Sequence, residues 1–382
     1  MRRVPVGTII DLGRVRIVLG FALLLLCEPL RSQPVQAPSK YFGPADDALW
    51  HSVAQAGQRK AVLRAIDGSL RYLRTPRAAS AYARLRTKGV SRARVRRSLI
   101  RFRQLFLAAR STSQLEAALR REFVLYRPAS RVHFTGYFQP TYAASRRPNA
   151  VYRYPLFRMP PSLARARLQP TRLQLEGADG LHISPLLRGY DIAWLRDRLQ
   201  AYLVQVEGSA HLQLTDGRTM TIGYGGHTNH AYTSMGRELV KAGVMPFEKL
   251  TLPALVDYFH AAPQEMNRYL PPNRRFVFFR ETRGAAVAGS LGVPLTPEHS
   301  MATDAAALPP GALALAQIEL ANPVAARVFG SQTITRWVLG QDAGGAIKGA
   351  ARVDLFMGTG VRAGTRAGVI NSMGQLAYLL LK

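Results

Sequence analysis

The sequence is poor in cysteine and in acidic residues, and each shortage narrows the classes of protein to which the chain can belong. It holds one cysteine, Cys27, among 382 residues, which excludes an internal disulfide framework and a cysteine-rich zinc site. Its 23 acidic residues are outnumbered by 52 lysines and arginines, for a formal net charge of +29. Such a chain binds polyanions, which include nucleic acids, anionic lipids and cell-wall polymers, and composition alone does not choose among them.

Long apolar runs are also missing, and one short run stands out. Four arginines within residues 2–16 precede ten largely apolar residues at 17–26, a pattern typical of a secretory signal. The run is shorter than the ~20 residues of a membrane-spanning helix. We therefore expect residues 1–37 to be a targeting segment and the protein to be exported; the alternative is a buried helix of the mature domain. Cys27 stands where a lipidated cysteine would, but Leu26 before it departs from the small residue of lipidation signals.

The remaining chain has a helical first part and a strand-rich second part. Residues 44–126 place apolar side chains at helical spacing, as in Val95, Leu99 and Phe102, and predict helices. The stretch 51–130 carries 19 lysines and arginines against three acids. We interpret these as solvated faces of amphipathic helices, with a surface for an anionic polymer as the alternative.

From residue 131 onward, short segments rich in β-branched and aromatic residues alternate with Gly, Pro and Asn. We expect strands and turns at 132–138, 215–225, 275–280, 312–318, 333–339 and 351–356. Short helices are expected near 194–204 and 251–270, and strand and loop over 296–382. This mixture predicts an α+β fold with one or two small β-barrels.

Common motifs of metal and nucleophilic chemistry are absent. His227 and His230 stand three residues apart in a Gly-rich segment but have no cysteine or acid nearby, which favours a loop over a zinc site. There is no H-E-x-x-H motif, no P-loop and no G-x-S-x-G elbow. We therefore expect no metal and no cofactor.

Acids are so scarce toward the C-terminus that their positions are informative. Three of the four acids after residue 300 are Asp304, Asp342 and Asp354, and the last lies between Val353 and Leu355. Burying an ionised carboxylate is costly, and burial raises its pKa, as a general acid near neutrality requires. The alternative is that these aspartates lie in turns, where Asp beside Gly is common. The pattern alone leaves both interpretations open.

These aspartates belong to a longer set of motifs. The set comprises 134–140 (FTGYFQP), 154–160 (YPLFRMP), 222–229 (IGYGGHTN), 232–237 (YTSMGR), 276–281 (FVFFRE), 292–297 (GVPLTP) and 341–349 (QDAGGAIKG). In this order, the motifs resemble the membrane-bound lytic murein transglycosylase A family. The three aspartates resemble those of its C-terminal "three-aspartate" (3D) domain. The resemblance covers about 130–375, and the helical region before it carries no matching motif.

The resemblance implies a double-psi β-barrel domain with N-terminal helices and a second β-barrel domain inserted into it, with a groove between. We expect residues 38–140 and 273–382 to form the first domain and 141–272 the inserted one. It also implies a periplasmic enzyme, anchored to the outer membrane if Cys27 is lipidated. Its partners would be peptidoglycan glycan strands and an anionic wall or membrane surface. The sequence leaves the oligomeric state open, and we expect a monomer.

The resemblance further implies cleavage of the β-1,4 bond between N-acetylmuramic acid and N-acetylglucosamine, which leaves a 1,6-anhydromuramyl end. Asp354 would be the general acid and base, with Asp342 and Asp304 in support. An attacking hydroxyl within the same sugar makes one positioned carboxyl sufficient.

Substrate contacts are expected from Thr135, Gly136, Tyr137, Gln139, Tyr224, Asn229 and Lys348. Gln139 stands where many relatives have Glu, so this position can form hydrogen bonds but cannot act as an acid.

Two other classes of function compete with this interpretation. A barrel that binds peptidoglycan without cleaving it is the first, because a fold does not fix a function. A nucleic-acid-binding protein is the second, suggested by the charge. The export signal and the absence of a recognised basic-helix or aromatic RNA motif argue against it, so no nucleic acid is expected as a partner.

Overall fold

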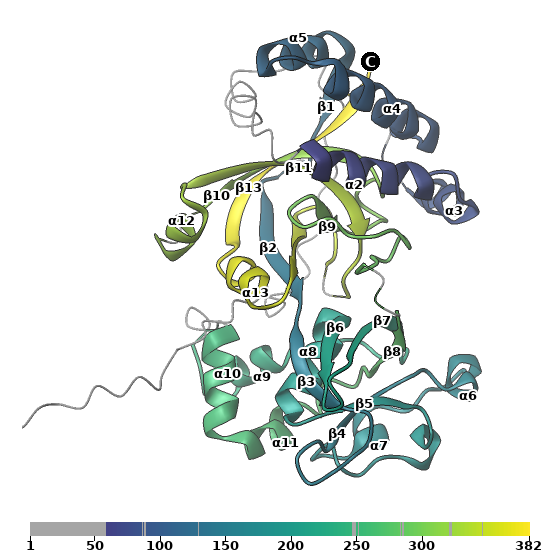
Figure 1. The fold of residues 1–382 in the computed structure, drawn as a ribbon, viewed down its shortest axis with the longest axis vertical. Helices are drawn as coiled ribbons and strands as arrows, with labels where there is room; N and C mark the ends of the chain where they lie inside the picture. The colour runs from purple at the N-terminus through teal and green to yellow at the C-terminus, as the bar shows by residue number, and fades with distance from the viewer. Residues whose placement is uncertain are drawn as a thin grey trace, which may run out of the picture.

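The computed structural model describes residues 59–382 except 86, 88, 129, 247–249, 251, 283, 285, 321, 322 and 346. The expected targeting segment 1–37, with Cys27, lies outside the described residues. Within them the chain forms a mixed α+β structure with two sheets, and Figure 1 shows one sheet in each half of the molecule. The α+β prediction is therefore confirmed. None of the described helices is long and apolar enough to cross a bilayer.

Within the described residues, four helices precede the first strand and cover one end of the upper sheet in Figure 1. They are α2 (Arg59–Tyr72), α3 (Pro76–Arg84), α4 (Arg92–Ala108) and α5 (Thr112–Glu122). The hydroxyls of Thr75, Ser91 and Ser111 cap the last three by accepting a backbone N–H of the first turn. Phe102 of α4 packs edge-on against Trp337, with ring centroids 4.9 Å apart. The helical prediction is thus confirmed for these helices but is wrong at 123–126, which form the first strand, β1 (Phe123–Tyr126).

The three acids of this basic region all pair with arginines. The pairs are Arg103–Asp67 at 2.9 Å, Arg120–Glu116 at 2.9 Å and Arg101–Glu122 at 2.6 Å. Two of these ion pairs join α4 to α2 and to α5, and the third lies within α5. The surplus of positive charge stays on the helix surfaces.

The upper sheet has seven strands and closes on itself. Its strands are β1 (Phe123–Tyr126), β2 (Val132–Gln139), β9 (Ser300–Ala302), β10 (Leu313–Glu319), β11 (Thr333–Asp342), β12 (Arg352–Thr359) and β13 (Asn371–Leu381). Their order is β1-β13-β10-β11-β9-β12-β2, and β13 also pairs with β2. This last pairing joins six of the strands in a ring. Within it, β12 runs parallel to β2 with Asp354 beside Thr135, while Asp354 is also paired with Ala302 of β9.

The lower sheet has six strands in the order β4-β5-β3-β6-β7-β8. They are β3 (Thr141–Ser145), β4 (Tyr154–Phe157), β5 (Asp191–Leu195), β6 (Ser209–Leu214), β7 (Thr219–His227) and β8 (Val277–Glu281). The accompanying helices are α6 (Pro161–Arg165), α7 (Arg172–Glu176), α8 (Arg198–Glu207), α9 (Met235–Lys241), α10 (Leu252–Ala261) and α11 (Met266–Tyr269). Only Pro140 separates β2 from β3, and Figure 1 shows β2 running from one half of the molecule into the other.

The expected strands are present, and two further expectations, both about helices, are wrong. Residues 191–195 form β5, so the helix expected near 194–204 begins only at 198. The segment 296–382 is not strand and loop throughout, because it contains α12 (Pro323–Phe329) and α13 (Val361–Gly368).

Small residues allow the second of these helices to pack closely on β2. A Cβ on Gly136 of β2 would lie 2.7 Å from the Cα of Ala367 in α13. A Cβ on Gly364 would lie 2.9 Å from the ring of Phe138. The glycines that suggest a loop in the sequence thus allow α13 to pack directly on β2.

Candidate active site

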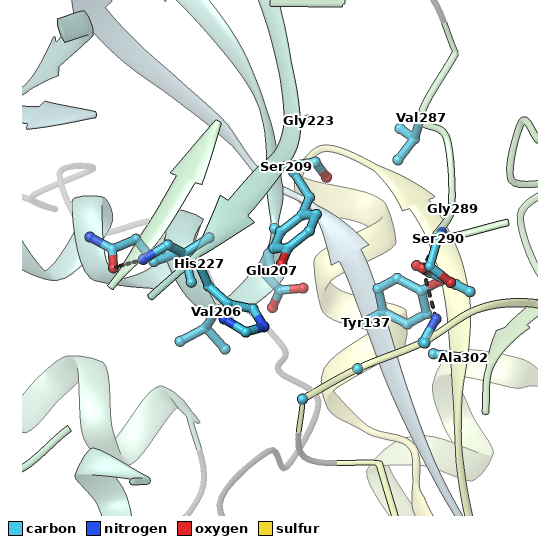
Figure 2. A pocket seen from close by; sticks show the side chains of 18 of the residues that line it. Tyr137, Val206, Glu207, Ser209, Gly223, His227, Val287, Gly289, Ser290 and Ala302 are labelled. Atoms are coloured by element: carbon cyan, nitrogen blue, oxygen red, sulfur yellow. Dashed lines mark hydrogen bonds between the residues drawn. The ribbon is translucent and has the colours of Figure 1, made fainter. Parts of the chain in front are cut away.

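A cavity of about 570 Å³ lies between the two sheets, within the usual size of a ligand site. Tyr137, Gln139, Asp342 and Asp354 line it from the seven-stranded sheet, and Glu207, Tyr224 and His227 from the other half. Figure 2 shows Val206, Glu207 and His227 on one side and Tyr137, Ser290 and Ala302 on the other. The two halves of the chain therefore build one site together.

Asp354 is the most deeply placed acid of the cavity wall. Its neighbours Val353 and Leu355 point into the core on the opposite face of β12, and Asp354 itself is 3% exposed. Its Oδ1 accepts a hydrogen bond from the hydroxyl of Thr135 and lies 3.5 Å from Nε of Arg352. The burial expected from the sequence is confirmed.

Burial dominates the electrostatics of this carboxyl. Desolvation raises the pKa of Asp354; the positive charges of Arg352 and His133 oppose the rise, and the charge of Asp342 adds to it. A buried carboxyl that holds its proton to higher pH is suited to general acid catalysis.

Asp342 lies at the end of β11 and receives three hydrogen bonds. Its Oδ1 accepts from the backbone N–H groups of Ser290 at 2.7 Å and Ala343 at 2.8 Å. Its Oδ2 accepts from the hydroxyl of Tyr137 at 2.9 Å. Burial raises the pKa of Asp342, and these hydrogen bonds oppose the rise. The side chain is held in one orientation in the wall beside Asp354.

Glu207 is a third carboxyl in the cavity, and the sequence analysis missed it. It is the last residue of α8, and both of its carboxylate oxygens are buried. Desolvation raises the pKa of Glu207 to about 8; the nearby backbone N–H of Phe138 opposes the rise, and the charge of Asp354 adds to it. The apolar run Leu203-Val-Gln-Val206 before it was a usable signal, since an acid beside apolar residues was the argument for Asp354.

Tyr224 supplies an aromatic surface that faces the cavity. It is 50% exposed, although it lies in the middle of β7. The register of β7 on β8 shifts between Tyr224 and Gly226, and a Cβ on Gly225 would lie 2.7 Å from the backbone of Phe279. A bulge that reorients a side chain at this point leaves the Tyr224 ring available to a ligand.

The remaining predicted site residues do not line the cavity. Thr135 is fully buried against Asp354, and Gly136 lies under α13. Asn229 donates from its side chain to the carbonyl of Arg167, whereas Lys348 is exposed.

Asp304 stabilises a turn next to the site. Its Oδ1 accepts from the N–H of Ala306 at 3.0 Å and its Oδ2 from the N–H of Gly349 at 2.8 Å. It therefore holds the segment after β9 against the Gly-rich segment that follows Asp342.

The two histidines of β7 and the following loop bond to backbone oxygens. Nδ1 of His227 lies 2.8 Å from the carbonyl of Thr228, and Nε2 of His230 lies 2.7 Å from that of Gln169. Within the described residues, no group of three His, Cys, Asp or Glu side chains is arranged to hold a metal.

Comparison with known proteins shows which family this chain resembles. Residues 133–280 match the MltA specific insert domain, and residues 299–380 match the 3D domain. A Vibrio cholerae protein named membrane-bound lytic murein transglycosylase A is 33% identical over 255 residues. The chain belongs to this family. The alignment covers 66% of the chain and 66% of the Vibrio protein, slightly less than two thirds of that relative's length.

Solved structures show that the fold is that of the transglycosylase A family. A membrane-bound lytic murein transglycosylase from Agrobacterium tumefaciens superposes with a TM-score of 0.65 at 24% identity, over 80% of this chain and 91% of that one. Escherichia coli MltA with bound chitohexaose superposes with a TM-score of 0.63 at 24% identity, over 91% of this chain and 94% of that one.

Proposed function

We propose that the protein is a peptidoglycan lytic transglycosylase that cleaves the β-1,4 bond from N-acetylmuramic acid to N-acetylglucosamine and leaves 1,6-anhydromuramyl ends. The observation that carries the proposal is Asp354, a buried carboxyl with a raised pKa in the wall of a cavity of ligand size. The names of the relatives supply the substrate class, and the neutral hexasaccharide bound to the Escherichia coli protein agrees with a glycan in the cavity.

Asp354 acts twice in this mechanism. Because its Oδ1 accepts from Thr135, the transferable proton belongs on Oδ2. That proton goes to the glycosidic oxygen as the bond to C1 of the muramyl residue breaks. The Asp354 carboxylate then takes the proton of the muramyl C6 hydroxyl, while the C6 oxygen bonds to C1. No water is consumed, and one carboxyl is sufficient.

The other acids have supporting roles in this proposal. Asp342 adds negative charge that keeps Asp354 protonated. Glu207, with a pKa of about 8, is neutral at pH 7 and can donate a hydrogen bond from across the cavity. Asp304 fixes the loops beside Asp342, whereas Tyr137, Gln139 and Tyr224 contact the sugars.

The architecture and location belong to the same proposal. The closed ring of strands is a double-psi β-barrel, built from the chain on either side of the six-stranded sheet. That sheet is the inserted β domain, and because β8 belongs to it, the inserted domain extends beyond the expected 141–272 to 281. The chain is exported to the periplasm through 1–37, where it works as a monomer on peptidoglycan. Lipidation of Cys27 would attach it to the outer membrane.

The test is to incubate the full-length protein with purified peptidoglycan and identify the products by mass spectrometry. The wild type and the control Asp216→Asn, in an exposed hairpin turn, should release products with 1,6-anhydro ends. Asp354→Asn should lower the rate at least 1000-fold, because it cannot donate or accept the proton. Reducing muramyl ends would instead indicate a hydrolase, which normally needs two carboxylates.

A variant of Glu207 tests whether a second carboxyl takes part in the cleavage reaction. Glu207→Gln keeps the hydrogen-bond donor but cannot exchange a proton, so activity should survive this change. A loss as large as that of Asp354→Asn would contradict the mechanism with one acid. If the folded wild type binds glycan strands and cleaves none, the protein is a peptidoglycan-binding module.

A further inference from the structure

Arginines line the same cavity as the acids, and most of them are not neutralised. Arg77 of α3, Arg275 just before β8, and Arg280 within β8 face it, together with Arg172. Arg172 is satisfied by Glu176 at 3.0 Å and by Gln205 at 2.7 Å. The ion pairs among the described residues include none to the other three arginines.

Arg275 is the best placed of these three. Its Nε donates to the carbonyl of His230 at 2.8 Å, which fixes the guanidinium plane. A Cβ on Gly345 would lie 2.6 Å from its Nη1. The guanidinium therefore reaches from the half with the six-stranded sheet to the glycine segment after Asp342, and the absence of a side chain at Gly345 makes room for it.

Partial burial disfavours the positive charge of Arg275. Desolvation lowers the pKa of Arg275. Two tyrosines, Tyr224 and Tyr232, rather than a carboxylate, oppose this decrease. A partly buried cation without an anionic partner is unfavourable unless a ligand provides one. A guanidinium presents a planar fork of N–H donors that matches a carboxylate in two parallel hydrogen bonds.

We propose that Arg275, with Arg77 and Arg280 nearby on the cavity wall, binds a carboxylate carried by the glycan strand. This inference rests on the proposed function and adds to it a preference for anionic over neutral glycans. Peptidoglycan offers such a carboxylate in two places: on the lactyl group of a muramyl residue without peptide, and on the stem peptide. A chito-oligosaccharide has the same backbone linkage and no carboxylate.

The test measures dissociation constants by calorimetry on the full-length chain carrying Asp354→Asn, which prevents turnover. The probes are chitohexaose, a peptide-free oligosaccharide of alternating N-acetylglucosamine and N-acetylmuramic acid, and the same oligosaccharide with stem peptides. Arg275→Gln should weaken the anionic probes about tenfold, or about 1.4 kcal/mol, and leave chitohexaose unchanged. Whichever anionic probe loses affinity identifies the source of the carboxylate.

Two matched variants separate charge from structure. Arg275→Lys keeps the charge without the fork and should recover part of the lost affinity, and that part should shrink as salt is added. Arg274→Gln removes an exposed neighbouring arginine that does not line the cavity and should change nothing.

Three results would overturn the inference. Equal losses for chitohexaose and the anionic probes would make Arg275 a structural residue, and no loss for any probe would exclude it from binding. If the wild type neither binds nor cleaves any glycan, the proposed function fails as well. A failure of selectivity alone, with cleavage intact, overturns only this inference.

Discussion

Replacing Glu207 by glutamine should remove a large part of the pH dependence of the protein's stability. In the folded chain both carboxylate oxygens of Glu207 are buried, and the pKa rises from 4.5 to about 8. In the unfolded chain the carboxyl is in water and ionises near its ordinary pKa. Glutamine has nearly the shape of the protonated acid and cannot ionise, so the variant keeps the neutral form at every pH.

The sign and size follow from proton linkage. Below pH 4.5 the carboxyl is protonated in both states and contributes no pH dependence. Between pH 4.5 and about 8 the unfolded chain gives up the proton that the folded chain retains, so stability falls by about 1.4 kcal/mol per pH unit. The loss reaches about 3 kcal/mol at pH 7 and about 5 kcal/mol above pH 8.

The measurement is urea unfolding of both proteins at steps from pH 4.5 to 8.5. Subtracting the free energies of unfolding of the two proteins cancels the titration of other groups. Glu207→Gln should become more stable relative to the wild type as the pH rises. The control is Glu319→Gln, where the side chain is 54% exposed and pairs with Arg131 on the surface. A difference that stays constant across this range would refute the assignment of a buried, protonated Glu207.

Two further changes test the packing and the hydrogen bonds around the cavity. Gly136→Ala places a Cβ 2.7 Å from the backbone of Ala367, so α13 must shift, and urea unfolding should show a loss of about 1–3 kcal/mol; an unchanged midpoint would contradict the contact. Tyr137→Phe removes the hydroxyl that donates to Asp342 at 2.9 Å while keeping the ring contact with Phe356. It should cost about 0.5–1.5 kcal/mol by the same assay, and a gain in stability would show that this bond is not formed.

The sequence was most informative where one local pattern fixes both structure and burial. The apolar spacing of Val95, Leu99 and Phe102 predicts the helix that α4 forms, since those residues face the core. Asp354 between Val353 and Leu355 is buried as expected, because alternation along β12 places it opposite two core residues.

The sequence was less informative where distant segments decide the outcome. Glu207 ends an ordinary helix, and it becomes a cavity acid only because the end of β2, near Phe138, lies against it. Thr135 was expected to touch substrate, but the register of β2 on β12 places its hydroxyl on Asp354. The cavity arginines, such as Arg275, are likewise indistinguishable in the sequence from the many arginines on the surface.

The ring of strands around Asp354 is assembled from opposite ends of the chain. β2 ends at Gln139, and its two partners in the ring, β12 and β13, begin at Arg352 and Asn371. Pairing across so long a separation must await closure of a very large loop, which includes the entire six-stranded sheet. A chain still being synthesised therefore cannot form the Thr135–Asp354 bond before β12 is made, and the ring stays open until β13 pairs with β2 and β10. Asp354 can therefore lie in a complete cavity wall only after β13 has been made.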